Sequence, residues 1–417
     1  MNRYFDIHAY FRKVGFAFRA LENRNFRLYF FGASVSLMGT WIQNLAIGWM
    51  VYRLTDSAFY LGLVGFAGQI PALILTPLAG VFADRTNRFK VLVITQSIPM
   101  ILAFILAILT FSGHITVNYL LIIVVINGIA IAFDTPFRHA FLLDMLGDKK
   151  LIPNAVALNS TLFNTARFIG PSLGGLLIAL FGEAVCFLIN GISFSGVIVA
   201  LLMMRLPGFV RPVSRMSVFG ELKEGLSYAW NFLPARYMIS LAMVLSFFGL
   251  PFQSFLPVYA ADILNGDSQL LGFLTGALGA GALSGALFLA SQNSIRGLPT
   301  LIRNAALLFG VALLAFSMSH YAWLSLLLLF ITGFGMIISF ASTNTLLQSV
   351  VAEDRRGRVL ALYSMSFLGF TPVGSLLLGL AAEYLSVPYT TLAASMICLL
   401  FALFYATKAK IVKQQIL

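Results

Sequence analysis

The chain has 417 residues, of which 59% are hydrophobic and only 10% are charged, and its mean hydropathy is +0.92. Soluble globular proteins carry about 25% charged residues, and disordered chains combine low hydrophobicity with high charge density, so both classes are excluded. The formal net charge is +12, but the basic residues are scattered between apolar runs, a pattern that argues against nucleic acid as a partner. This is the composition of a polytopic membrane protein.

Twelve apolar runs follow one another along the chain, each long enough to cross the core of a bilayer. Residues 1–26 precede them and carry aromatic residues among basic ones, as in an amphipathic helix on the cytoplasmic membrane surface or a mobile basic tail. Between spans six and seven, residues 206–236 form a linker in which apolar residues from Phe219 to Trp230 repeat at helical spacing and predict a surface helix. The predicted spans are 27–52, 57–82, 89–112, 117–145, 154–181, 184–205, 237–263, 268–291, 297–318, 321–349, 357–384 and 388–407.

The pattern predicts an all-α membrane protein with twelve transmembrane helices in two pseudo-symmetric six-helix bundles, residues 27–205 and 237–407. Residues 408–417 form a short tail. Of the 27 lysines and arginines, 24 fall on the termini, on the even-numbered loops or in the span ends beside them, so both termini are predicted to be cytoplasmic. The opposite loops are mildly acidic and contain Asp56, Glu183, Asp262, Asp267 and Glu383.

The two halves repeat one another but differ in buried charge. The segment from Gly128 to Gly175 aligns with the segment from Gly335 to Gly379. An ionisable residue inside a span costs roughly 3 kcal/mol or more and marks a functional site by default. Three such residues occur in the first half, and the N-terminal bundle is therefore predicted to be the chemically active one. They are Asp134, Arg138 and Arg167. In the alignment of the two halves, uncharged residues stand at the corresponding positions of the second half, namely Ala341, Thr345 and Thr371.

These three charged residues are predicted to form a proton-coupling network. Asp134 and Arg138 lie four residues apart, so they share one helix face and can pair. Helical rise places Arg167 of span five at a similar depth. Movement of cargo or of a helix could then load and release a proton at the carboxylate. A permanently paired structural network is the alternative interpretation.

Neutral polar residues also fall in the middle of spans, and with Trp41 they are predicted to line a substrate cavity. They are Gln43, Asn44, Gln69, Asn164, Gln253, Asn344 and Tyr363. The two cysteines, Cys186 and Cys398, lie inside separate apolar runs and predict buried thiols. The sequence offers no metal-ligand spacing, no nucleotide-binding loop and no nucleophile–base set, so we expect no metal, no cofactor, no ATPase subunit and no enzymatic activity.

Several motifs resemble those of the major facilitator superfamily of secondary transporters. One is Gly80-Val-Phe-Ala-Asp84-Arg85-Thr-Asn87-Arg88 between spans two and three, and another is Gly170-Pro171-Ser-Leu-Gly174-Gly175 in span five. A narrower resemblance is to the branch of enterobactin exporters and macrolide efflux pumps, which are drug:proton antiporters. It rests on Asn23-Arg24-Asn25-Phe26-Arg27, Phe133-Asp134-Thr135-Pro136 and Gly357-Arg358-Val359.

The resemblance implies two structural roles. A cytoplasmic gate would join the end of span two to the start of span eleven, where free backbone N–H groups suit a carboxylate; a topology anchor is the alternative. The glycine-proline motif, Gly170, Pro171, Gly174 and Gly175, would bring helices close and limit leak, with ordinary packing as the alternative. The gate residues would be Gly80, Asp84, Arg85, Arg88, Gly357 and Arg358.

The function implied by this resemblance is a proton-coupled exporter of a bacterial inner membrane. It would act as a monomer and move a small organic molecule, siderophore-like or amphiphilic and drug-like, by alternating access. Span four of many such exporters carries an arginine where this chain has Val124, which makes Asp134 with Arg138 the local substitute. An importer or uniporter, a lysolipid flippase, and a non-transporting membrane sensor or scaffold remain alternatives.

Overall fold

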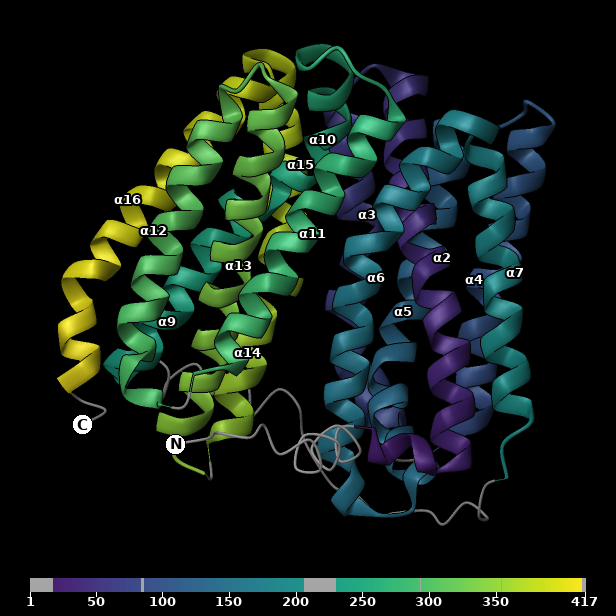
Figure 1. Cartoon of the computed structure of the whole chain (residues 1–417), viewed down its shortest axis with the longest axis horizontal. Helices are drawn as coiled ribbons and strands as arrows, with labels where there is room; N and C mark the ends of the chain where they lie inside the picture. The colour runs from purple at the N-terminus through teal and green to yellow at the C-terminus, as the bar shows by residue number, and fades with distance from the viewer. Residues whose placement is uncertain (1–17, 84–85, 206–229, 293, 354, 415–417) are drawn as a thin grey trace, which may run out of the picture.

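The computed structural model describes residues 18–83, 86–205, 230–292, 294–353 and 355–414, and these ranges are helical with no β-strand. Two bundles stand side by side, one built from α2 to α7 and the other from α9 to α16 (Figure 1). The predicted all-α, two-bundle membrane fold is therefore confirmed. Part of the predicted N-terminal segment (1–17) and most of the linker (206–229) lie outside the described residues.

The first bundle contains six long helices joined by short turns. Their ends follow the local sequence: the Asn23 and Asn87 side chains cap α2 and α4 by accepting backbone N–H bonds, and Gly147, at φ 65°, ends α5 in the left-handed region. The Asn25 side chain exchanges two hydrogen bonds with the backbone of Arg205 beyond α7, which ties the ends of the bundle together. The helices are α2 (Arg24–Thr55), α3 (Ala58–Ala83), α4 (Arg88–Phe111), α5 (Val117–Leu146), α6 (Ile152–Phe181) and α7 (Glu183–Leu202).

The second bundle contains two interrupted spans. Span seven runs from Leu233 to Ile263 through α9 (Leu233–Val244), η3 (Leu245–Gly249), η4 (Leu250–Phe255), α10 (Leu256–Val258) and η5 (Tyr259–Ile263). Span eleven is divided at Gly369, where the ring of Pro372 removes a helical donor and crowds the carbonyl four residues earlier. The other helices are α11 (Ser268–Ala290), α12 (Leu298–Ser317), α13 (Ala322–Val350), α14 (Arg356–Leu368), α15 (Phe370–Leu385) and α16 (Val387–Gln414).

Ten helical segments within the described ranges are long and apolar enough to cross a membrane. The remaining two long helices, α2 with 32 residues and α6 with 30, complete the twelve. Both carry polar residues in their middle turns, and this lowers their mean hydropathy. As shown below, many of those polar residues face an internal cavity rather than lipid.

The two ends of the molecule differ in charge and are named here by it. The acidic end carries Asp56, Glu183, Asp262, Asp267 and Glu383, and the basic end is the opposite one, predicted to be cytoplasmic. Exposed aromatic side chains gather near the acidic end, as expected where a membrane meets water. They are Tyr321, Trp323, Tyr384 and Tyr389.

The bundles touch each other at the acidic end through two helix crossings. In the first, α6 meets α11 so closely that a Cβ atom on Gly175 would lie 2.9 Å from the Cα of Gly272. In the second, α3 meets α15, and a Cβ atom on Gly379 would lie 3.1 Å from the Cα of Gly62. Only glycine permits backbones to approach this closely. The first crossing joins spans five and eight and the second joins spans two and eleven, so in a repeat of six spans the two crossings are equivalent to each other.

Acidic side chains strengthen this closure. The Glu383 carboxylate at the end of α15 accepts hydrogen bonds from the Ser57 hydroxyl and, at 3.1 Å, from the Phe59 N–H at the start of α3. It thereby caps a helix that belongs to the other bundle. The Tyr52 hydroxyl of α2 donates to Asp262 in η5, a second bond between the bundles.

The bundles are apart at the basic end, where the resemblance placed a gate. A Cβ atom on Gly80 of α3, or on Gly357 of α14, would meet no heavy atom within 4 Å among the described residues. Arg88 pairs with Asp144 of α5 at 3.1 Å, within its own bundle. Asp84 and Arg85 lie outside the described residues, so the proposed contact of Asp84 with α14 stays a prediction. The structure is thus closed at the acidic end, whereas at the basic end Gly80 and Gly357 have no close neighbour among the described residues.

The glycine crossing predicts that Gly175→Val prevents closure of the acidic end. The added side chain would collide with the backbone of Ser268 and Gly272, so the bundles must separate there. Spin labels on Ser112→Cys and His320→Cys, exposed positions at the acidic ends of the two bundles, should then lie farther apart by double electron–electron resonance.

The matched control is Gly196→Val on α7. Gly196 is exposed, and a Cβ atom there meets nothing within 4 Å, so the distance should stay as in the wild type. An unchanged distance in Gly175→Val would contradict this account of the closure.

Candidate functional site

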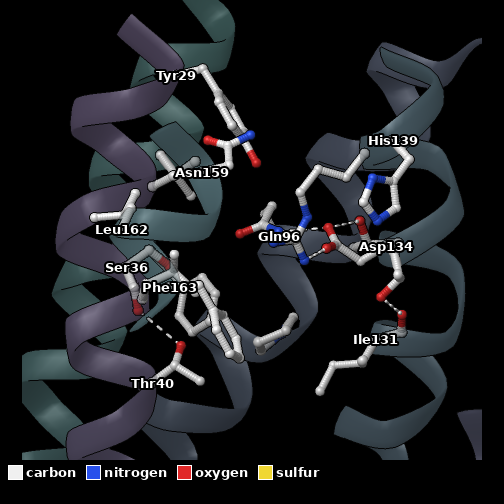
Figure 2. Close-up of a pocket in the computed structure, with 18 of the residues that line it drawn as sticks. Tyr29, Ser36, Thr40, Gln96, Ile131, Asp134, His139, Asn159, Leu162 and Phe163 are labelled. Carbon is white, nitrogen blue, oxygen red and sulfur yellow. Dashed lines mark hydrogen bonds and ion pairs between the residues drawn. The ribbon is translucent and has the colours of Figure 1, made fainter. Parts of the chain in front are cut away.

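A cavity of about 550 Å³ lies inside the N-terminal bundle. Its walls come from α2, α4, α5, α6 and α7, and it extends from Tyr29 and Met145 near the basic end to Asn44 and Asn164 in the middle of their helices. Figure 2 shows Ile131, Asp134 and His139 on one side and residues of α2 and α6, among them Ser36, Thr40, Leu162 and Phe163, on the other. Its volume and mixed polar and apolar walls suit a small organic molecule.

Asp134 of α5 forms the charged centre of this cavity. Its side chain is only 4% exposed and forms an ion pair with Arg138, one helical turn away. Its second oxygen accepts bonds from the Thr95 hydroxyl at 3.1 Å and the Gln96 amide at 2.6 Å, both on α4. Three donors therefore satisfy the carboxylate inside the bundle, as a buried charge requires.

Arg138 is less enclosed than its partner. Its side chain is 37% exposed, and the exposed part faces the cavity. Its Nε atom is buried and has no acceptor among the described residues. The pair thus presents a partly satisfied guanidinium to whatever occupies the cavity, with the carboxylate behind it.

Arg167 does not join this pair. Its guanidinium forms no hydrogen bond or ion pair with any other described residue. Its carbonyl oxygen lies against Gly279 of α11, where a Cβ atom would approach it to 2.7 Å, so Arg167 stands at the limit of the α6–α11 crossing. The structure therefore brings together two of the three predicted network residues and holds the third apart.

Three of the predicted cavity residues, Gln43, Asn44 and Asn164, line this cavity. The Gln43 side chain accepts a 2.9 Å hydrogen bond from Asn190 of α7, which fixes the wall between α2 and α7. Trp41 lies beside the cavity: its ring packs edge-on against Phe163, 5.7 Å between centroids.

The other predicted cavity residues lie elsewhere. Gln69 of α3 donates to the Gly65 carbonyl of its own helix, and Asn344 of α13 accepts from Gln348. Gln253 is half-buried in η4. Tyr363 is 3% exposed, and its hydroxyl donates to the Phe340 carbonyl at 2.6 Å. None of these four lines the 550 Å³ cavity.

Aromatic side chains fill the corresponding place in the second bundle. Phe340, Tyr363 and Phe367 form a cluster with ring centroids 4.9–5.4 Å apart. In the repeat, Tyr363 stands opposite Asn159 and Phe367 opposite Phe163. A tyrosine thus replaces a small amide in the second half, and Tyr363 does not line the 550 Å³ cavity; its place in a substrate cavity stays a prediction.

The glycine-proline motif of α6 makes two contacts. A Cβ atom on Gly170 would lie 2.6 Å from the Cβ of Trp41, and one on Gly174 would lie 3.2 Å from the Cα of Ile42, so this face packs on α2. Gly175 packs on α11 as described, and the Pro171 carbonyl lies against Gly272. Pro171 lies within an unbroken helix. The motif fixes α6 between the two bundles.

Thr95 and Gln96 are the functional residues that sequence reasoning missed. Both are ordinary polar residues in an apolar span, and only the packing of α4 on α5 shows which of its faces meets Asp134. Their occurrence side by side inside a span was the one available signal. No group of three or more histidine, cysteine or acidic residues in the described part of the chain is arranged to hold a metal ion.

The family follows from comparison with known proteins. The model of the transmembrane secretion effector family, a group of major facilitator transporters, matches residues 16–416. The chain belongs to this family. It is a multi-pass membrane transporter, not an enzyme.

Named relatives of this transporter include exporters. The staphyloferrin A transporter of Staphylococcus aureus is 28% identical over 91% of this chain and 96% of its own length. The multidrug efflux pump Tap of Mycolicibacterium fortuitum is 26% identical over 89% and 93%. Macrolide efflux protein A of Streptococcus pyogenes is 21% identical over 87% and 91%.

Solved structures share the fold. A bacterial homologue of the human lysosomal transporter Spinster, described as inward-facing and unoccupied, superposes with a TM-score of 0.70 at 13% identity, covering 94% of this chain and 97% of its own. A bacterial homologue of the iron transporter ferroportin gives a TM-score of 0.68 at 16% identity over 92% and 99%. The agreement in fold along nearly the whole chain matches the major facilitator expectation.

The geometry of the charged pair predicts energetic coupling between Asp134 and Arg138. Removing one partner leaves the other uncompensated inside the bundle, whereas removing both leaves two neutral groups. In a double-mutant cycle with Asp134→Asn and Arg138→Gln, thermal unfolding in detergent should give a coupling free energy of about 1 kcal/mol, moderated by the partial exposure of Arg138. Additive effects of the two substitutions would show that the pair contributes nothing to stability.

Proposed function

We propose that the protein is a proton-coupled exporter of a small organic molecule, siderophore-like or amphiphilic and drug-like, that works by alternating access. It acts as a monomer in a bacterial inner membrane with both termini in the cytoplasm. The proton gradient drives it, with no bound cofactor and no ATPase subunit. The names of the relatives, a siderophore transporter and two drug efflux pumps, support export and this range of cargo.

The observation that carries the proposal is the buried Asp134 carboxylate on the cavity wall. Such a residue is expensive within a membrane unless it has a function. Arg138, its charged partner, reaches the cavity, where cargo can contact it. If cargo or a helix movement draws Arg138 away, the carboxylate is left to take up a proton instead. Cargo and proton would thereby compete for the same centre, which is the requirement for an exchange of the two.

The state of the two ends supports a direction for the cycle. With the acidic end closed by the two glycine crossings, cargo from the cytoplasm would enter the cavity through the basic end. Rocking of the bundles would then open the two glycine crossings and expose the cavity to the outside. There Asp134 would take up a proton, and its return to the paired state would release that proton inside.

Asp134→Asn should lower the rate of proton-driven uphill transport in proteoliposomes more than tenfold, because an amide cannot exchange a proton. Exchange of labelled for unlabelled cargo at equal concentrations should persist, since it needs no net proton movement. Macrolides, siderophores and lysolipids form the substrate panel, tested with an imposed pH gradient.

Glu183→Gln is the matched control. Glu183 is also a buried carboxylate of the N-terminal bundle paired with an arginine, Arg53 at 2.8 Å, but it lies at the acidic end away from the cavity. This variant should keep uphill transport. Uphill transport retained by Asp134→Asn would contradict the proposed role of Asp134.

A further inference from the structure

Arg167 is a cation inside the membrane that has no partner among the described residues. Asp134 is already satisfied by Arg138, Thr95 and Gln96, and no acceptor within the described ranges bonds the Arg167 guanidinium. An unpaired arginine in a span costs several kcal/mol. The unpaired arginine is stabilised only when a bound molecule supplies an anion to pair with it.

Arg167 is not one of the residues that line the 550 Å³ cavity, but it lies on the same face of α6 as lining residues one and two turns earlier. One face of the helix, with Gly170 and Gly174, packs on α2, and another, with Ser172 and Gly175, packs on α11. Ser160, Asn164 and Arg167 follow one another at helical spacing between these two faces. Ser160 and Asn164 both line the cavity, so Arg167 continues the same stripe by one turn toward the acidic end.

The direction of side chains on a helix brings the guanidinium back to the cavity. Long side chains lean toward the N-terminus of their helix and cover the turn before their own Cα. For Arg167 that turn holds Phe163 and Asn164, both cavity residues. The residue therefore stands at the inner limit of the cavity, where the α6–α11 crossing ends at Gly279.

The charges around the cavity favour an anion. Asp134 is the one acidic residue in its described lining, and Arg138 balances it. Arg167, just beyond this lining, adds one positive charge that has no partner among the described residues. A cationic cargo would find no free carboxylate here, whereas a carboxylate can receive a bidentate contact from a guanidinium.

From these observations we infer that Arg167 recognises the cargo and that this cargo is an organic anion bearing a carboxylate. The inference rests on the proposed transport function and specifies the chemistry of its cargo.

The test compares 4-phenylbutyrate with its amide, two probes of the same shape that differ in charge. Binding to the purified full-length protein in lipid nanodiscs is measured by isothermal titration. Wild-type protein should bind the carboxylate at least tenfold more tightly than the amide. Arg167→Gln should reduce this preference to about one while leaving amide binding unchanged, and Arg167→Lys should keep part of it because it keeps the charge.

Two controls separate recognition from a structural role. Arg53→Gln removes an arginine at the acidic end, away from the cavity, and should keep the tenfold preference. Thermal unfolding of Arg167→Gln should occur at the wild-type temperature or above, because the variant loses an unpaired charge. A marked loss of stability would instead indicate a structural arginine and overturn the inference.

Three further results would overturn the inference. These are equal binding of the two probes by the wild type, no binding of the carboxylate at millimolar concentration, and a preference that survives in Arg167→Gln. None of these results would affect the proton-coupling proposal, which depends on uphill transport and on Asp134. Loss of coupling in Asp134→Asn with no carboxylate preference would retain the proposed function and reject this cargo class.

Discussion

The close approach of backbones at the acidic end is the constraint on which the rest of the structure depends. At Gly175–Gly272 and at Gly62–Gly379 the helices meet without intervening side chains, and these contacts hold the bundles together at the acidic end. Because α6 takes part in one of these crossings and also lines the cavity, any movement at the crossing is transmitted to the cavity wall. Glu383 and Asp262 add polar bonds between the bundles that water can replace when this end opens. The helices are therefore tightly packed at this end, while the hydrogen bonds between the bundles can break and form again.

The two bundles share a fold but differ in the side chains that occupy corresponding places. In the first bundle small polar residues leave space around a buried ion pair, and in the second Phe340, Tyr363 and Phe367 fill the corresponding place. The second bundle can then serve as the rigid counterpart against which the first one moves. Such an arrangement confines the cost of buried charge to one side, where the charges have partners or, at Arg167, a proposed ligand.

Much of the fold could be predicted from the sequence because membrane insertion imposes strong and simple rules. Apolar runs fixed the number of spans, although α2 and α6 fall below a plain hydropathy threshold since they place polar residues on a cavity. The pairing of Asp134 with Arg138 followed from their spacing on one helix. Contacts within one helix need no knowledge of tertiary packing, which is why this prediction succeeded.

Contacts between helices were harder to predict. Thr95 and Gln96 meet Asp134 only because α4 presents that face to α5, and nothing in their local sequence reveals it. Polarity and a mid-span position were the basis for predicting four further cavity residues, Tyr363, Gln69, Gln253 and Asn344. A mid-span polar group can instead bond a backbone carbonyl, as the Tyr363 hydroxyl does with Phe340. Position along a helix follows from the sequence, whereas the direction in which each side chain points depends on how the helices pack.

The most direct test of the account is a simultaneous recording of cargo and proton fluxes by the wild-type protein in one population of proteoliposomes. Substrate from the panel of siderophores, macrolides and lysolipids would be loaded on one side, with an internal pH indicator reporting protons. The account predicts that cargo and protons move in opposite directions at a fixed ratio, and that cargo accumulates against its gradient only while the pH gradient lasts. Cargo movement that is indifferent to the pH gradient, with no accompanying proton flux, would contradict it.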